Sequence, residues 1–409
     1  MTDPVPIFVD LAARHDRCFW LDGGGSRAWS GRRSILGWLD DSDVSLAYSA
    51  TSGEVLRHAD GASTVVGTDI FDALEAEMAG DGPEVHWVGY LGYASRPDLP
   101  ASVDPEDPMP TAVWMRTSNI HVVDHEPRAA SVVEELCPGD PEPVTPQYRA
   151  AFEAVQEQLH AGNSYEVNLT YRVDVHSDLD PVTAYLRLRE LNPAPYAGFL
   201  QHHGSWLLSS SPERYATIDR HRTIVTKPIK GTTPRGGSAE EDEALRDRLA
   251  SDPKFRAENL MIVDLLRNDL GMVCEPGSVE VPVLMDVESY ESVHQLVSTV
   301  RGRLRDEVST VGALRALFPA GSMTGAPKLR TMEVIRSVES TPRGVYAGAF
   351  GWVSGDGRAD LGVVIRSLTT DGSGRWRLGT GGGITVRSQV DEEYAESRWK
   401  AERLLHVFD

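Results

Sequence analysis

The stretch TKPIKGTTPRG at residues 226–236 is the one around which we expect the rest of the chain to be organised. The chain holds five lysines against thirty-five arginines, and two of these scarce lysines stand in this stretch. Lys230 lies between Pro228, which stiffens the backbone, and Gly231, which lets it turn tightly. A lysine kept here serves either as an anion anchor or as a nucleophile, because a deprotonated lysine is a reactive amine whereas arginine stays charged. The stretch alone leaves both roles open.

The composition argues against two classes of binding partner. The 409 residues are 41% hydrophobic, which is enough for a substantial core, and they carry a formal net charge of −21. This charge argues against nucleic acid and anionic membrane surfaces as partners, since both select for basic patches. The N-terminus lacks a basic start and no stretch approaches the roughly eighteen apolar residues of a membrane span, so we expect a soluble, cytoplasmic protein. The widely spaced Cys18, Cys137 and Cys274 indicate neither a disulfide framework nor a zinc site.

In the N-terminal part, residues 1 to about 95 mix short apolar runs with glycine turns, and the proline-rich stretches 97–110 and 138–146 are predicted to be loops or linkers. Residues 85–93 are predicted to form a buried strand pair or bend, and residues 111–124 to form one strand. His121 and His125 have the spacing of helical metal ligands. They lie at the end of a strand pattern, however, which makes a metal site the less favoured alternative.

The next elements lead towards Lys230. A cap and a first-turn proline predict a helix over residues 146–162, and alternating patterns predict strands over 164–173 and 205–218. Glu213 lies within the last of these, just before the turn that feeds Lys230. A carboxyl and an amine could therefore face one cavity.

The alternative for Glu213 is an ordinary salt bridge with Arg214 or Arg235, which is the commoner fate of a charged pair.

A long helix is predicted over residues 253–271, where apolar side chains nearly surround the axis. This pattern predicts that the helix is buried. Glu258, Asp264 and Arg267 would then need partners, because unpaired buried charge is costly. A metal ion would supply one for Glu258.

The segment GSMTGAPK at residues 321–328 is predicted to be a loop that enters a helix with Pro327 at its first position. Free backbone amides at a helix start can bind anions. Three strands in a meander are predicted to follow, over residues 345–354, 359–370 and 375–386. Arg366 would stand inside the apolar middle strand, where an anion is its natural partner.

The C-terminal segment carries two further features. The run GTGGG at residues 379–383 indicates close approach of a ligand to the backbone and suits a glycine nest for a carboxylate. The last helix is predicted to open at Ser388. Its residues Glu393, Glu396 and Lys400 share one face at spacings of three and four.

Six ordered motifs resemble the chorismate-binding family, which includes anthranilate synthase component I, aminodeoxychorismate synthase component I, isochorismate synthase and salicylate synthase. The motifs are PIKGTTPRG, ENLMIVDLLRNDLG, GSMTGAPK, the strand around Arg366, GTGGG and EEYAESRWK. The resemblance covers residues 146–409, and residues 1–145 resemble the variable N-terminal part of the family. It implies an α/β (α+β) fold in which two large antiparallel sheets pack together with helices outside. The active site would lie in the cleft between the halves.

The resemblance also implies a ligand set. Glu258 and Glu396 would ligate Mg²⁺, with Glu393 close by through water, and the metal would hold the ring carboxylate of chorismate. The other implied contacts of chorismate are Arg366 and Tyr346 at the enolpyruvyl carboxylate, the amides of Gly381 and Gly383, the pocket residues Thr324, Gly325 and Lys400, and His294 near the leaving hydroxyl.

Two positions imply which reaction follows. Anthranilate synthases carry PIAGT, whereas PIKGT is the mark of aminodeoxychorismate synthase. In that family Lys230 would attack ring C2 while Glu213 protonates the departing C4 hydroxyl, and ammonia would then enter at C4 to give 4-amino-4-deoxychorismate. Isochorismate and salicylate synthases have a general-base lysine at the position of Glu166. Many free-standing relatives have glutamine there, so the resemblance leaves the role of Glu166 open.

The source of ammonia and two alternatives complete the prediction. No glutaminase pattern surrounds a cysteine, which implies a separate glutamine amidotransferase subunit. One alternative is amination at C2, as in anthranilate or 2-amino-2-deoxyisochorismate synthesis. The other is a catalytically silent, chorismate-binding regulatory subunit. For catalysis Glu213 should be protonated when Lys230 is neutral. Burial and Lys227 or bound Mg²⁺ are expected to lower the pKa of Lys230, whereas an ionised Glu213 would raise it.

Overall fold

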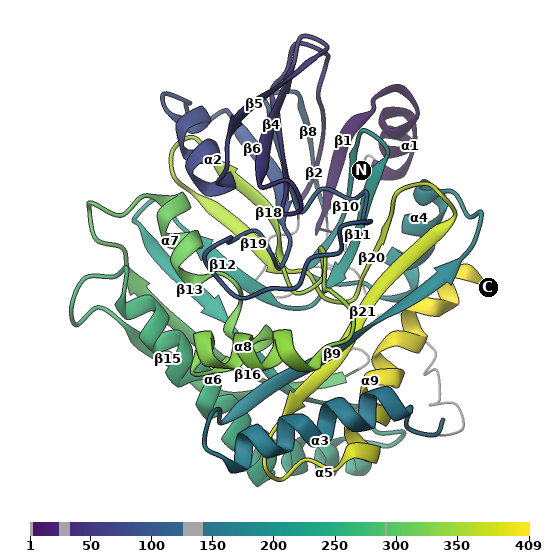
Figure 1. Cartoon of the computed structure of the whole chain (residues 1–409), viewed down its shortest axis with the longest axis vertical. Helices are drawn as coiled ribbons and strands as arrows, with labels where there is room; N and C mark the ends of the chain where they lie inside the picture. Colours follow the sequence, from purple (N-terminus) through teal and green to yellow (C-terminus); the bar gives the residue numbers. More distant parts are fainter. Residues whose placement is uncertain (1–2, 24–32, 126–141, 291–292) are drawn as a thin grey trace.

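Two antiparallel sheets pack together with helices outside them in the computed structural model, which describes residues 3–23, 33–125, 142–290 and 293–409 (Figure 1). This arrangement confirms the predicted fold class. Cys18 and Cys274 are buried free thiols, and Cys137 lies outside the described residues. Among the described residues, no helix is long and apolar enough to cross a membrane.

The first sheet has nine strands and draws on both parts of the chain. Its long strands β9 and β21 run side by side across the molecule (Figure 1). In spatial order the strands are β17 (Gly325–Ala326), β9 (Glu166–His176), β21 (Arg375–Ile384), β20 (Ser367–Thr370), β11 (Ser205–Ser211), β10 (Tyr196–His202), β1 (Arg17–Asp22), β2 (Arg33–Trp38) and β8 (Ile120–Asp124).

The second sheet has twelve strands, and it also mixes the N-terminal and C-terminal parts. In spatial order they are β14 (Ile229–Pro234), β16 (Val293–Arg303), β13 (Thr223–Lys227), β12 (Arg214–Ile218), β19 (Ala359–Val363), β18 (Ala349–Ser354), β6 (His86–Leu91), β7 (Ala112–Thr117), β3 (Ser45–Ser49), β4 (Glu54–Ala59) and β5 (Ala62–Gly67), with β15 (Glu280–Ser289) paired to β16.

The helices cover the outer faces of the sheets. Near the nine-stranded sheet lie α1 (Pro4–Arg14), α4 (Pro181–Leu191) and α9 (Val390–Leu405), whose apolar residues share a cluster with β1, β10 and β21. Near the twelve-stranded sheet lie α2 (Ile70–Met78), α6 (Pro253–Gly271) and α7 (Thr310–Leu317). The remaining helices are α3 (Pro146–His160), α5 (Ala239–Ser251), α8 (Lys328–Val338) and the 3-10 turns η2 (Gly321–Met323) and η3 (His406–Phe408).

Buried side chains from both inner faces form the core between the sheets. Phe19 and Leu200 of the nine-stranded sheet belong to one cluster with Val88 and Phe350 of the twelve-stranded sheet. Such burial of apolar surface is the main favourable term in folding. It fixes the relative position of the sheets, and therefore of any groups that face each other across them.

Three segments that were predicted as single strands each form two strands. All three predictions were wrong for the same reason. The predicted ranges 111–124, 205–218 and 359–370 each begin in one sheet and end in the other, as β7 and β8, β11 and β12, and β19 and β20. Each half alternates normally within its own sheet, so the sequence pattern continues across the break. The crossings at residues 212–213 and 364–366 lie beside each other, because β11 pairs with β20 and β12 pairs with β19.

The long helix α6 is buried on one face only. Glu258 and Asn259 are buried, but Leu260 is exposed, and Asp264 and Arg267 pair with each other at 2.9 Å in solvent. The prediction of a fully buried helix was therefore wrong for these positions. An i,i+3 surface ion pair accounts for the last two charges.

The predicted starts of two helices also shift slightly. Helix α8 begins at Lys328, so Pro327 is its N-cap rather than its first residue. Helix α9 begins at Val390, because the Ser388 hydroxyl accepts a hydrogen bond from the Thr385 amide (3.1 Å) in the preceding turn.

Sheet packing predicts the effect of one substitution. A Cβ at Gly198 of β10 would lie 2.6 Å from the Phe350 ring and 2.8 Å from the Trp20 carbonyl oxygen. Because overpacking a close-packed core forces shifts, Gly198→Ala should lower the free energy of unfolding by about 1–3 kcal/mol. In Gly67→Ala, the control, the added Cβ meets no atom within 4 Å and should cost nothing. Equal urea midpoints for the two variants would contradict this account of the packing.

Candidate functional site

A cavity of about 1000 Å³, including its open mouth, lies where the two sheets meet α6 and α9. Strands β14 and β21, the crossings at residues 212–213 and 364–366, and both helices contribute to its wall. The predicted site residues that line it are Lys230, Glu213, Glu258, Glu393, Glu396, Lys400, Arg366, Tyr346, Gly381 and Gly383.

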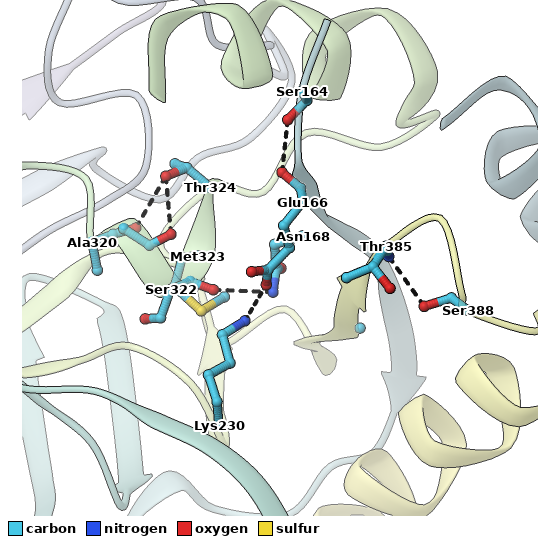
Figure 2. Close-up of polar contacts among 12 residues, drawn as sticks. Ser164, Glu166, Asn168, Lys230, Ala320, Ser322, Met323, Thr324, Thr385 and Ser388 are labelled. Carbon is cyan, nitrogen blue, oxygen red and sulfur yellow. Dashed lines mark hydrogen bonds and ion pairs between the residues drawn. The ribbon is translucent and has the colours of Figure 1, made fainter. Parts of the chain in front are cut away.

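Lys230 lies on strand β14. The pairing of β14 with β16 shifts register between Ile229 and Thr232, and Gly231 takes a φ of +93° there, a conformation that favours glycine. The Lys230 ammonium, buried at 8% exposure, forms an ion pair with Glu166 Oε1 on β9 (Figure 2). This contact joins the two sheets at the cavity.

The surroundings of Lys230 keep it charged. Burial lowers the pKa of Lys230, but the carboxylates of Glu166 and Glu258 outweigh burial and raise that pKa above its ordinary value. Lys227, which was expected to lower the pKa, is held by Glu288 at 2.5 Å. The resting amine therefore carries its proton. Burial lowers its pKa and Glu213 raises it as expected, but the expectation took no account of Glu166 and Glu258.

Glu213 occupies the crossing between β11 and β12. Its carbonyl accepts a hydrogen bond from the Val363 amide at 3.0 Å, and its buried carboxyl accepts one from the Ser322 hydroxyl at 2.6 Å. Burial raises the pKa of Glu213 to about 7, while Ser322 and Lys230 limit the rise. Glu213 therefore keeps a proton up to about neutral pH, as an acid catalyst requires.

The acidic side of the cavity comes from α6 and α9. Glu393 receives an ion pair from Lys254 at 2.6 Å, and Glu396 receives one from Lys400 at 2.7 Å. Burial raises the pKa of Glu258 to about 8, and its Oε1 atom has no hydrogen-bond partner among the described residues. This oxygen is available to a ligand.

These carboxylates fit Mg²⁺ in kind. Magnesium prefers oxygen ligands, usually one or two carboxylates, and keeps several waters. The unpartnered oxygen of Glu258 meets this requirement. Over the part of the chain that the structure describes, no three His, Cys, Asp or Glu side chains stand close enough to form a ready-made metal site. Glu393 and Glu396 would have to exchange their lysine partners for the ion.

Arg366 lies in the turn between β19 and β20, not inside a strand as predicted. It has a φ of +51°, and its carbonyl accepts hydrogen bonds from the Ser210 amide (3.1 Å) and hydroxyl (2.8 Å). Its guanidinium stacks 5.8 Å from the Trp399 ring and, within the described ranges, pairs with no carboxylate. Burial, and then Arg403, lower its pKa to about 10. An anion would relieve this desolvated charge.

The glycine run in β21 allows close approach by protein side chains. A Cβ at Gly379 would enter the Tyr346 ring, and one at Gly383 would meet Glu166 Oε1 and lie 3.0 Å from Lys230 Nζ. The run is part of a regular strand paired with β9, and not a separate nest as predicted. Lys400 also reaches this strand, donating to the Gly381 carbonyl at 3.2 Å.

Three predicted site residues do not line the cavity. The His294 ring bonds the Ser289 hydroxyl (2.8 Å) and Asp242 (2.9 Å), on the face opposite Gln295, which does line the cavity. Fully buried Thr324 bonds the carbonyls of its own turn, and Gly325 pairs with β9. Their neighbours Ser322 and Met323 line the cavity instead.

Several residues of the candidate site were not predicted from the sequence. They are Asn168, Lys254, Gln295, Ser322 and Trp399, together with the contact that Glu166 makes. The scarcity of lysine could have identified Lys254, since three of the five lysines, at 230, 254 and 400, line this cavity. Ser322 and Trp399 lie within two of the quoted motifs, GSMTGAPK and EEYAESRWK, so the motifs were a signal for both.

The chain is similar in sequence to proteins of known families. The sequence pattern described as chorismate binding enzyme matches residues 139–406. An aminodeoxychorismate synthase of Streptomyces griseus is 39% identical over 100% of this chain and 63% of its own length. An aminodeoxychorismate synthase component 1 of Salmonella typhimurium is 44% identical over 64% of this chain and 58% of its own length. The chain thus spans less than two thirds of these relatives.

A solved structure has the same architecture. The crystal structure of anthranilate synthase component I from Streptococcus pneumoniae aligns with a TM-score of 0.76 at 27% identity, and the alignment covers 92% of this chain and 93% of that one.

The contact between Ser322 and Glu213 predicts a change in titration. The hydroxyl stabilises the charged carboxylate, so Ser322→Ala should raise the pKa of Glu213 further above about 7. Ser322→Thr keeps a hydroxyl and should restore the original pKa. Carbon-13 NMR titration of glutamate-labelled protein, with Glu213→Gln to assign the signal, measures this directly. A carboxyl that titrates near the ordinary glutamate value of about 4.3 would contradict the assignment.

Proposed function

We propose that this chain, which belongs to the chorismate binding enzyme family, converts chorismate and ammonia into 4-amino-4-deoxychorismate. One observation carries the proposal: a buried lysine, Lys230, and a buried carboxyl that keeps its proton near neutral pH, Glu213, line one cavity. These are the groups that a double displacement needs, a nucleophile and a general acid. The names of the Streptomyces griseus and Salmonella typhimurium relatives support the same reaction.

The first displacement uses both groups. The neutral amine of Lys230 forms a bond to ring C2, both ring double bonds shift to C1=C6 and C4=C5, and the C4–O bond breaks. Glu213 gives its proton to the departing hydroxyl, which leaves as water. Because Lys230 rests in its charged form, it must lose that proton before it attacks.

The second displacement regenerates the enzyme. Ammonia bonds to C4, both ring double bonds shift back to C1=C2 and C5=C6, and the C2–N bond breaks so that Lys230 leaves as a neutral amine. The new ammonium group on C4 returns one proton to Glu213. One ammonia has entered and one water has left.

Positive groups would hold the two carboxylates of chorismate in this acidic protein. Arg366 and Lys400 line the cavity, and Arg366 has no carboxylate partner within the residues that the structure describes. Glu258 and Glu396 would hold Mg²⁺, with Glu393 nearby through water. When bound, the ion would supply positive charge to a substrate carboxylate.

A partner would supply the ammonia. The relative from Salmonella typhimurium is named component 1, which supports a second component. We assign that role to a glutamine amidotransferase subunit acting in the cytoplasm. Purified protein alone should then use ammonium salts but not glutamine.

Amination at C2 is the second candidate, because the chain resembles an anthranilate synthase structure over nearly its whole length. The substitution pattern of the product separates the two reactions. A silent regulatory subunit is disfavoured by the intact pair of Lys230 and Glu213 in the cavity.

The product assay and two lysine variants test the proposed reaction. With chorismate, Mg²⁺ and ammonium at mildly alkaline pH, the protein should form the C4-amino product, identified by mass and NMR. Lys230→Arg keeps a charge but cannot supply a neutral amine, so C4 amination should fall by on the order of 10³-fold or more. Lys230→Ala should do the same or redirect nitrogen to C2.

The arginine variant distinguishes the two roles of Lys230. An anchor needs only its charge, so C4 amination at an undiminished rate in Lys230→Arg would contradict the nucleophilic role. A C2-amino product from the unchanged protein would favour the second candidate.

The carboxylate assignment predicts a defect in metal binding. Glu258→Gln and Glu396→Gln should each weaken Mg²⁺ binding by about tenfold or more, because each removes a charged oxygen ligand. Isothermal titration calorimetry measures this without turnover. Glu392→Gln, an exposed change on the same helix as Glu396, is the control and should leave binding unchanged. Unchanged Mg²⁺ binding in both cavity variants would remove these ligands from the assignment.

A further inference from the structure

Two buried acceptor oxygens beside Lys230 have no hydrogen-bond donor. They are Oε2 of Glu166 and Oδ1 of Asn168, and neither has a partner within the described part of the chain. Their residues are 1% and 7% exposed. Burying a polar atom without a partner costs free energy, and the cost is higher for a charged group. An occupant that donates hydrogen bonds would remove this cost.

The two side chains are fixed so that these oxygens are left over. Glu166 and Asn168 are two positions apart on β9 and therefore point to the same face of the sheet. Glu166 uses Oε1 to hold Lys230, and Asn168 donates through Nδ2 to the Ser322 carbonyl at 3.2 Å. Figure 2 shows both side-chain ends together between Ser322 and Lys230. Each residue therefore offers one remaining acceptor in the same place.

The occupant must be small and rich in donors. Gly383 packs directly against this place, since a Cβ there would already lie 3.0 Å from Lys230 Nζ. Both remaining groups are acceptors, and the Lys230 ammonium donates to Oε1 and to neither of them. A carboxylate favours a cation over a neutral donor. Ammonium meets these requirements because it carries four N–H donors and a positive charge.

We propose that Glu166 Oε2 and Asn168 Oδ1 form a binding site for ammonium beside Lys230. The role of this site rests on the proposed function, in which ammonia enters the ring at C4 while Lys230 is attached at C2. Binding itself requires no turnover. The site also gives Glu166 a role that the resemblance to other chorismate-binding enzymes leaves open.

Binding is measured with the full chain and no chorismate. Ammonium chloride should raise the thermal midpoint saturably, compared with tetramethylammonium chloride at equal ionic strength, because a ligand of the folded state stabilises it. Tetramethylammonium has the same charge but no N–H donors. Glu166→Gln and Asn168→Ala should each weaken the ammonium response by about tenfold to hundredfold.

The control variant carries the same Glu→Gln change at a position away from the proposed site. Glu333→Gln makes the same change on the exposed side of α8 and should leave the ammonium response unchanged. If one cavity variant does not fold, as judged by its melting curve without ammonium, the other still decides the question. An unchanged protein without an ammonium-specific response would overturn the proposal, and so would folded variants that respond as it does.

A heavy monovalent cation locates the site. Crystals soaked in rubidium chloride should show an anomalous peak in contact with Glu166 and Asn168, since Rb⁺ is close to ammonium in size and charge. A peak only among Glu258, Glu393 and Glu396 would overturn the proposal.

Kinetics separate this inference from the proposed function. If the reaction is as proposed, Glu166→Gln and Asn168→Ala should raise the KM for ammonium by about tenfold or more, and the KM for chorismate much less. Specific ammonium binding in a protein that aminates nothing would leave the site standing and remove the proposed function. Amination with the KM for ammonium unchanged in both variants would remove the ammonium site and leave the proposed function standing.

Discussion

The buried ion pair between Lys230 and Glu166 is the constraint on which the site depends. It joins β14 of one sheet to β9 of the other. Two charges leave water to make it, and this is tolerated only where geometry and neighbours compensate. The register shift at Gly231 and the absence of a side chain at Gly383 make room for the contact. The packed core between the sheets then fixes where the pair stands.

The crossing of strands between the sheets explains how the other groups reach Lys230. Glu213 lies at one crossing and Arg366 at the next, and the two crossings are adjacent because their flanking strands pair in both sheets. Both side chains line the cavity that contains Lys230. The proposed acid, Glu213, and the proposed anion-binding group, Arg366, are therefore both positioned by chain segments that pass from one sheet to the other.

The sequence predicts the chemistry of this site better than its geometry. Scarce lysine and ordered motifs indicated Lys230, Glu258 and Lys400. Caps and periodicity predicted α3, α6, α8 and α9 to within a few residues, whereas α1, α2, α4 and α7 were not predicted. The crossings were missed because alternation continues when a strand changes sheet. The resemblance implied His294 near the leaving hydroxyl, but the His294 ring contacts Asp242 and the next residue, Gln295, lines the cavity, because adjacent strand residues face opposite sides.

The protonation states connect the fold to the proposed reaction. Burial keeps a proton on Glu213, and nearby carboxylates keep one on Lys230. The central claim is that Lys230 becomes covalently attached to the ring. The most direct test is peptide mass spectrometry after incubation with a chorismate analogue that undergoes the first displacement but is slow in the second. The account predicts a mass increase on the peptide that contains Lys230, absent in Lys230→Ala. Full turnover of chorismate to the C4-amino product with no adduct on that peptide would contradict it.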